Sequence, residues 1–279
     1  MDAVWRGVKA QMSCSSQRLR SMPAAGIALG AELDEWVAER RKYLESVAAT
    51  FENINATYVV SIGSPADVVI EALEKTTNPL LVMASHGRSG LSRLFAGSVA
   101  SRILSEVHCP ILLIRAHMPE LPAGATAPFT KALVPLDGSE FGERVISEAL
   151  DAIDDEALAL HLLRVVTIPV MTMATAGDPS AAMNYGLVGE YLDATNDEAK
   201  EYLAALAARL GADGRTVTWE VREGDVATEI NAVADEQKAD LIAMSTHGRG
   251  GLGRLIFGSV AEKVLHSANR PLLLIRPKG

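Results

Sequence analysis

Met244–Leu265 reads MSTHGRGGLGRLIFGSVAEKVL, and a second version of this stretch, MASHGRSGLSRLFAGSVASRIL, stands 161 positions earlier at Met83–Leu104. The likeness joins residues 60–115 to residues 221–276 without a gap, with 22 identities in 56 positions. A repeat of this length is far longer than one solenoid unit, so it indicates two duplicated domains. Residues 116–130 hold three prolines and a single charge and are expected to be a linker between domains at 1–115 and 131–279.

Around the quoted stretch, the second copy alternates short apolar runs with segments of helical spacing. Strands are predicted at 131–136, 159–166, 217–221, 241–245 and 271–275, and helices at 144–153, 190–210, 226–237 and 258–267. Residues 167–187, rich in Thr, Ala, Met and Gly, are expected to form a mobile excursion. Such alternation is typical of a parallel sheet with helices on both faces, and a doubly wound sheet has the order 3-2-1-4-5.

The first copy is incomplete. It follows the second from the long helix at about Leu33 onward, but the positions equivalent to 131–160 would lie before Met1. The first strand and first helix of this copy are therefore expected to be absent, with Ala3–Val8 at most a remnant of the second strand. Without its central strand a sheet keeps unpaired backbone groups. Either the true start lies upstream or another segment fills the gap, and the sequence leaves both open.

Composition bounds the function classes. Apolar residues make up 48% and charged residues 22% of the 279 residues, as in ordinary globular proteins. No stretch approaches the ~18 uncharged apolar residues of a membrane span, and the amino-terminal residues lack a signal-peptide pattern, so a cytoplasmic protein is expected. The net charge of −9 argues against a nucleic-acid partner. Two cysteines, Cys14 and Cys109, cannot build a disulfide framework.

The glycine spacing in residues 244–265 matches the sequence patterns of two phosphate-binding loops poorly and a third pattern well. Gly248–Gly253 satisfies G-x-G-x-x-G but follows the fourth predicted strand, which argues against a dinucleotide fold, and no lysine precedes Ser259 as in a P-loop. Both copies instead place Gly-Ser-Val nine residues after the His-Gly pair, at a predicted helix start. Free N–H groups there attract anions. The alternative is that the glycines only form turns and that Ser259 is an N-cap.

This arrangement resembles the universal stress protein family, over the chain from about residue 33. Members that bind ATP carry G-x-x-G-x9-G-(S/T), and the second glycine, the spacing and the final Gly-Ser are present here, whereas Ala84 and Ser245 replace the first glycine. The family's early strand ends in V-P-x-D, as Val134–Asp137 does. The resemblance implies two flavodoxin- or Rossmann-like α/β domains (adenine nucleotide alpha hydrolase-like) with parallel sheets, the first lacking its first strand and helix.

The resemblance also implies a stress-response protein that binds ATP in its second domain, alone or with Mg²⁺ or Mn²⁺. In the family the aspartate lies near the ribose and metal, and a valine that ends the second strand, here Val165, touches adenine. The implied nucleotide-binding residues are Pro135, Asp137, Val165, Met244, Ser245, Gly248, Gly258, Ser259 and Val260. The first domain keeps Gly87, Gly97 and Ser98 but has no counterpart of Asp137, so weak or no binding is expected there.

Two other function classes stay open beside a nucleotide-dependent regulator. One is an interaction module of the same fold that binds no nucleotide, and the other is an enzyme that handles adenylates. Fast turnover is not expected, because no phosphate-clamping lysine and no positioned base are found, while slow ATP hydrolysis stays open. Protein partners are unknown. The resemblance implies that Ile111–Arg115 and Leu272–Arg276 meet antiparallel, and a homodimer stays open.

Overall fold

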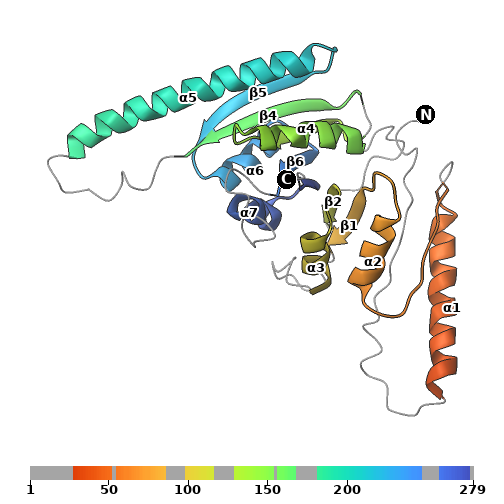
Figure 1. The fold of residues 1–279 in the computed structure, drawn as a ribbon. Helices are drawn as coiled ribbons and strands as arrows, with labels where there is room; N and C mark the ends of the chain where they lie inside the picture. Colours follow the sequence, from red (N-terminus) through yellow and green to blue (C-terminus); the bar gives the residue numbers. More distant parts are fainter. Residues whose placement is uncertain are drawn as a thin grey trace. The chain divides into compact units, whose positions relative to one another are not determined.

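The computed structural model describes residues 28–51, 55–85, 98–115, 129–153, 156–167, 181–246 and 258–276 (Figure 1). The helices are α1 (Ala28–Ala48), α2 (Pro65–Glu74), α3 (Ser98–Glu106), α4 (Glu140–Ile153), α5 (Ala181–Gly211), α6 (Val226–Glu236) and α7 (Ser259–Ser267). The strands are β1 (Leu81–Ser85), β2 (Ile111–Arg115), β3 (Lys131–Pro135), β4 (Ala159–Val166), β5 (Val217–Glu223), β6 (Leu241–Ser245) and β7 (Leu272–Ile275). Helices α1 to α3 belong to one compact unit, and the strands with α4 to α7 belong to the other.

One sheet of the order β1-β2-β7-β6-β3-β4-β5 holds the described strands. The second repeat supplies the run from β7 to β5, with parallel pairing at each step. In chain order within that repeat the arrangement is 5-4-1-2-3, which is the doubly wound order that the sequence predicts. The α/β fold class is confirmed.

Helices cover both faces of this part of the sheet. Right-handed crossovers place α4 and α5 on one face and α6 and α7 on the other. The core between these layers is built from aliphatic side chains, because strands that are buried on both faces read as continuous apolar runs. Its largest fully buried members include Leu133, Leu162, Leu163, Leu203, Ile230, Ile242 and Leu265.

Helices α2 and α3 of the first repeat contact each other in the same way as their equivalents α6 and α7 in the second repeat. Ser64 is the N-cap of α2 and Arg102 of α3 binds Asp67 and Ser64, while at equivalent positions Asp225 caps α6 and Lys263 of α7 binds Asp225. Gly63 and Gly224, which precede these caps, both have positive φ. The two helix pairs α2–α3 and α6–α7 are therefore the same structural piece, used twice.

The strands of the first repeat differ from those of the second. Residues 55–62, equivalent to the β5 region, form no strand, and Val59 and Ile62 are exposed. In the second repeat β5 pairs with β4, and among the described residues no strand precedes residue 55. The first repeat thus contributes β1 and β2 to the described sheet.

The closing strands of the two repeats meet. β2 and β7 pair antiparallel, with Ile111 opposite Leu274 and Leu113 opposite Leu272. The antiparallel meeting of these strands, expected from the resemblance, is present in the structure. Elsewhere, α5 begins at Ala181, so the expected excursion at 167–187 is wrong for its last seven residues, and 168–180 lie outside the described residues.

Candidate nucleotide site

The strand order of the second repeat reverses between β3 and β6. From β3 the chain moves outward through β4 to β5, and then returns to β6 and moves the other way to β7. β3 and β6 are parallel neighbours, with Ala132 opposite Leu241 and Leu133 opposite Ile242. In open α/β sheets ligands bind at the carboxyl ends of the strands beside such a reversal. The fold therefore points to the loops after Pro135 and Ser245.

Asp137 lies in the first of these loops and shapes it. Its Oδ1 accepts a hydrogen bond from Ser139 N at 3.0 Å and another from Ser139 Oγ at 2.6 Å. Ser139 Oγ in turn accepts from Gly142 N at 3.0 Å, in the first turn of α4. This is helix capping by a serine whose hydroxyl is oriented by an aspartate. The half-buried carboxylate is thus held at the carboxyl end of the sheet.

Two glycines allow this loop to form. Gly138 has φ of +78°, a left-handed conformation that a side chain disfavours. A Cβ on Gly142 would lie 2.9 Å from Asp137 Oδ1 and 3.5 Å from Ser139 Oγ. The close approach of α4 to the Asp137 carboxylate therefore depends on the absence of a side chain at Gly142.

The start of α7 lies at the end of β6. Gly258 N donates to Thr246 O at 2.8 Å, which closes the loop between the two elements. Gly258 is the N-cap of α7 and provides no side-chain hydrogen bond to the first turn, so Ser259 is the first helical residue and not the N-cap. Ser259 is exposed. A helix start that no side chain caps offers N–H donors to an anion.

The other residues implied by the resemblance are placed as follows. Pro135 ends β3, Val165 lies near the end of β4 and Ser245 ends β6, all three half-buried. Met244 is only 5% exposed, so it supports the site from within the core. Val260 is half-buried in the first turn of α7. Gly248 and the first-copy residues Gly87 and Gly97 lie outside the described residues.

Sequence reasoning missed polar residues that surround Asp137. Arg164 Nη1 donates to Leu136 O at 3.3 Å, so a guanidinium lies beside the backbone that carries Asp137. Tyr202 of α5 has a buried hydroxyl that lies near the Glu143 carboxylate but meets no partner among the described residues with hydrogen-bond geometry. Burial raises the pKa of Tyr202, and the nearby Glu143 carboxylate raises it further, while Arg164 lowers it. The sequence signal for Arg164 is a charged residue inside the mostly apolar run of β4.

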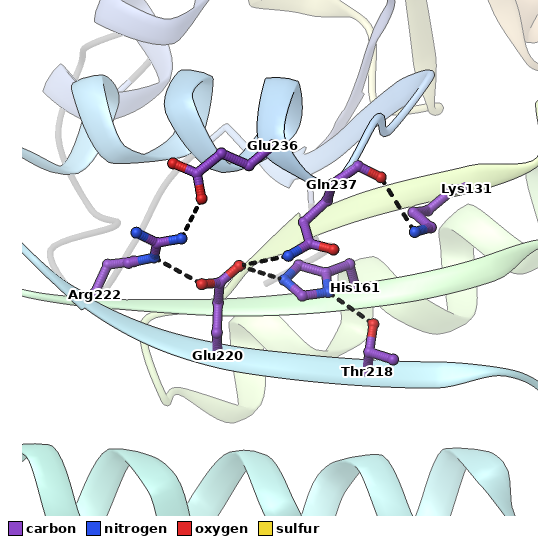
Figure 2. A network of polar contacts seen from close by, with 7 residues as sticks. All are labelled: Lys131, His161, Thr218, Glu220, Arg222, Glu236 and Gln237. Carbon is purple, nitrogen blue, oxygen red and sulfur yellow. Dashed lines mark hydrogen bonds and ion pairs between the residues drawn. The ribbon is translucent and has the colours of Figure 1, made fainter.

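A separate polar network lies on the face of the sheet that α6 covers, between β4, β5 and α6 (Figure 2). His161 of β4 is 3% exposed, and its Nδ1 lies 2.7 Å from Thr218 Oγ1 and its Nε2 2.8 Å from Glu220 Oε1. Glu220 also accepts from Gln237 Nε2 at 3.1 Å and from Arg222 Nε at 2.7 Å. The network extends to Glu236, which Arg222 binds, and to Lys131, whose Nζ donates to Gln237 O at 3.1 Å.

The protonation of this network follows from its burial. Burial lowers the pKa of His161, against the opposing influence of Glu220. Burial alone would raise the pKa of Glu220, but the hydrogen bonds from Arg222 and His161 outweigh it and lower that pKa. A neutral imidazole donates from Nε2 to the carboxylate and accepts the Thr218 hydroxyl at Nδ1. The network ties the edge strand β5 to β4 and α6, and it lies away from Asp137.

The sequence profile of the universal stress protein family matches residues 14–115 and again residues 128–276. The chain belongs to the universal stress protein family. A universal stress protein of Methanocaldococcus jannaschii is 30% identical over 149 residues, which are 53% of this chain and 82% of that protein. One from Mycobacterium tuberculosis is 27% identical over 255 residues, which are 86% of this chain and 75% of that protein.

A solved structure has the same fold. The universal stress protein from Archaeoglobus fulgidus is 21% identical with a TM-score of 0.59, and the match covers 91% of this chain and 82% of that one. This likeness supports the fold of a tandem universal stress protein. No helix among the described residues has the length and apolar character needed to cross a membrane.

Proposed function

We propose that this universal stress protein binds one adenine nucleotide in its second repeat and uses the bound state to regulate contacts with other proteins. The observation that supports the proposal most strongly is the meeting of two features at the strand reversal. The Asp137 carboxylate is fixed at the end of β3, and the start of α7, without a side-chain cap, is fixed at the end of β6. A ribose and a phosphate chain are the chemistry that a carboxylate and a row of N–H donors recognise.

The charges of the site support the same assignment. The acidic second half would repel a polyphosphate, so local donors must supply the attraction. The α7 N–H groups provide it, and Arg164 places a positive charge near Asp137. A divalent cation, Mg²⁺ or Mn²⁺, would be held by Asp137 together with phosphate oxygens, since one protein carboxylate plus phosphates is a usual Mg²⁺ arrangement. The cation would screen phosphate charge.

Turnover is not part of the proposal. The residues around Asp137 hold the loop by hydrogen bonds, and Tyr202, whose pKa is raised, keeps its proton at neutral pH. A hydroxyl that keeps its proton does not act as a general base. We therefore assign the described residues at the reversal a binding role. Any hydrolysis is expected to be slow.

Titration with ATP and Mg²⁺ by calorimetry tests the proposal, with Gly258→Asp as the informative variant. Gly258 has φ −68° and ψ 158°, a conformation that suits an aspartate N-cap, so the new carboxylate caps α7 and keeps or raises its stability. The same carboxylate repels phosphate, so binding is expected to be lost while the thermal midpoint is kept.

One matched control places the same substitution at the equivalent position of the first repeat. Gly97→Asp, at the equivalent position of the first repeat, is expected to leave both the stoichiometry of one and the affinity unchanged. Asp137→Ala should weaken binding without changing the first repeat. If Gly258→Asp binds as tightly as the unchanged protein, or if two equal sites are titrated, the proposed site is wrong.

A further inference from the structure

The first turn of α4 joins the Asp137 loop to helix α5. Asp137 orients Ser139 through hydrogen bonds to its N–H and its hydroxyl. The Ser139 hydroxyl accepts a hydrogen bond from Gly142 N at 3.0 Å, and its carbonyl oxygen accepts one from Glu143 N at 3.2 Å. The Glu143 carboxylate in turn binds the guanidinium of Arg209 on α5. A series of direct contacts thus runs from the Asp137 carboxylate to α5.

A second residue of α5 lies close to the same Glu143 carboxylate. The Tyr202 hydroxyl is buried near Glu143, about two helical turns before Arg209, but it meets no partner with hydrogen-bond geometry among the described residues. Buried hydroxyls are nearly always hydrogen-bonded in native proteins, and each exception needs an explanation. A small movement of the first turn of α4 would bring the Glu143 carboxylate into hydrogen-bond geometry with Tyr202.

The repeat separates the role of this tyrosine from the packing of its helix. α1 carries the pair Tyr43-Leu44, and α5 carries the pair Tyr202-Leu203. The leucine is buried in both helices, at 2% and 0% exposed, whereas Tyr43 is 54% exposed and the hydroxyl of Tyr202 is buried. The leucine therefore packs the helix in both repeats. Burial of the tyrosine hydroxyl belongs to the repeat in which the nucleotide site is proposed.

Helix α5 continues past the end of the sheet (Figure 1). Asn196 Nδ2 donates to Glu223 Oε1, and Glu223 is the last residue of β5, so residues 181–195 lie beyond that strand. At 1.5 Å per residue this part of the helix is about 22 Å long. Because a helix moves as a rigid element, a change in how α5 is held at Tyr202 also changes the position of residues 181–195.

We propose that Glu143 and Tyr202 are positioning residues that link the Asp137 loop to α5, so that nucleotide binding at the loop fixes α5 on the sheet. This inference rests on the proposed function. When the loop adjusts to a bound nucleotide, the first turn of α4 follows Asp137, because Ser139 is hydrogen-bonded to both. A carboxylate has two oxygens, so Glu143 can accept from Tyr202 and keep Arg209.

The link has a thermodynamic signature. A hydrogen bond from Tyr202 that forms only when nucleotide is bound strengthens nucleotide binding, and it does not stabilise the protein to which no nucleotide has been added. A tyrosine that only packs α5 has the opposite signature, because its hydroxyl would contribute equally to both states. The two roles are therefore separable by measuring affinity and stability on the same variant.

Hydrogen exchange of the full chain, with and without saturating ATP and Mg²⁺, tests the link, because two helices report separately. Slower exchange of the amides of residues 259–262, in the first turn of α7, reports that the site is occupied. Slower exchange of residues 196–210 of α5 reports the link. The expected slowing in α5 is about tenfold, the size of effect that one hydrogen bond to a carboxylate provides. Exchange in α1 should not change.

Tyr202→Phe removes the hydroxyl alone. It should weaken ATP binding about tenfold in calorimetry and keep the thermal midpoint that is measured without nucleotide. At saturating ATP it should lose the slower exchange in α5 and keep the slower exchange in α7. Tyr43→Phe is the matched control from the first repeat and should change none of these quantities. Glu143→Gln keeps an oxygen that accepts from Tyr202, so it should weaken binding less than Glu143→Ala does.

The outcomes separate the link from the proposed function. Slower exchange in α7 without slower exchange in α5 would show that the link is wrong while the nucleotide site stands. The link is also wrong if Tyr202→Phe binds ATP as tightly as the unchanged protein, or if its thermal midpoint without nucleotide falls and its α5 exchange still responds to ATP. No heat on titration, together with unchanged exchange in both helices, would contradict the proposed function and the link with it.

Discussion

Replacing His161 by phenylalanine tests the polar network between β4, β5 and α6. The imidazole is 3% exposed and makes two hydrogen bonds, of 2.7 Å to Thr218 and 2.8 Å to the Glu220 carboxylate. A hydrogen bond to a charged group contributes about 1.5–3 kcal/mol and one to a neutral group about 1 kcal/mol. The larger apolar ring offsets part of this loss, so we expect a free energy of unfolding lower by about 2 kcal/mol at neutral pH.

The pH dependence gives the sharper test. Burial lowers the pKa of His161 in the folded state below its ordinary value of 6.5. As the pH falls through 6.5, the unfolded chain takes up a proton that the folded chain does not, so the stability that is present above 6.5 is progressively lost. One group contributes at most about 1.4 kcal/mol per pH unit to this slope. The contribution of His161 to this slope should be absent from His161→Phe.

The assay is urea unfolding from pH 8 to pH 5, followed by Trp219 fluorescence with Trp5 and Trp36 replaced by phenylalanine. His161→Gln keeps a donor for Glu220 but does not titrate, so it should retain more stability than His161→Phe and show the same reduced pH slope. Replacement of the exposed His108 by glutamine is the control, and the variant should show the same slope of unfolding free energy against pH as the unchanged protein. An identical slope in the unchanged protein and His161→Phe, or a phenylalanine variant that is more stable at neutral pH, would refute the reasoning.

Three further substitutions have defined outcomes. Gly142→Ala should weaken nucleotide binding more than it lowers the thermal midpoint, because the new Cβ meets Asp137 Oδ1 at 2.9 Å; equal affinity in calorimetry would show that the loop yields freely. Tyr202→Phe should leave urea stability unchanged or raise it slightly, since the buried hydroxyl has no partner with hydrogen-bond geometry among the described residues, and a loss above about 1 kcal/mol would contradict this. Leu203→Ala, at a fully buried position of α5, should lower the free energy of unfolding by about 2–5 kcal/mol in the same assay, and a loss below this range would mean that the site collapses around the change.

The second repeat was largely predictable from sequence because its signals are local. Apolar runs gave β4 and β6 their bounds, and the antiparallel meeting of β2 with β7 followed from the family resemblance. The start of α5 was missed because residues 181–189, with two glycines, show no helical periodicity. The helix therefore begins before the segment in which apolar residues recur at helical spacing.

The missed features depend on contacts between distant residues. Nothing near Arg164 or Tyr202 in sequence shows that they lie beside the Asp137 loop, since β4 and α5 bring them there. Residues 55–62 likewise form no strand although Val59 and Ile62 suit one, and no strand is described before them. Local preference alone does not order a strand that has no partner.

We propose that the second repeat holds one adenine nucleotide between the Asp137 loop and the start of α7. The most direct measurement is to purify the full chain without added nucleotide, denature it with acid, and quantify the released nucleotide by chromatography with mass detection. About one ATP or ADP per chain is expected, and none from Asp137→Ala or Gly258→Asp, since both changes fall in the proposed site. No nucleotide in the unchanged protein, together with no heat on titration with ATP and Mg²⁺, would contradict the claim and leave an interaction module that binds no nucleotide.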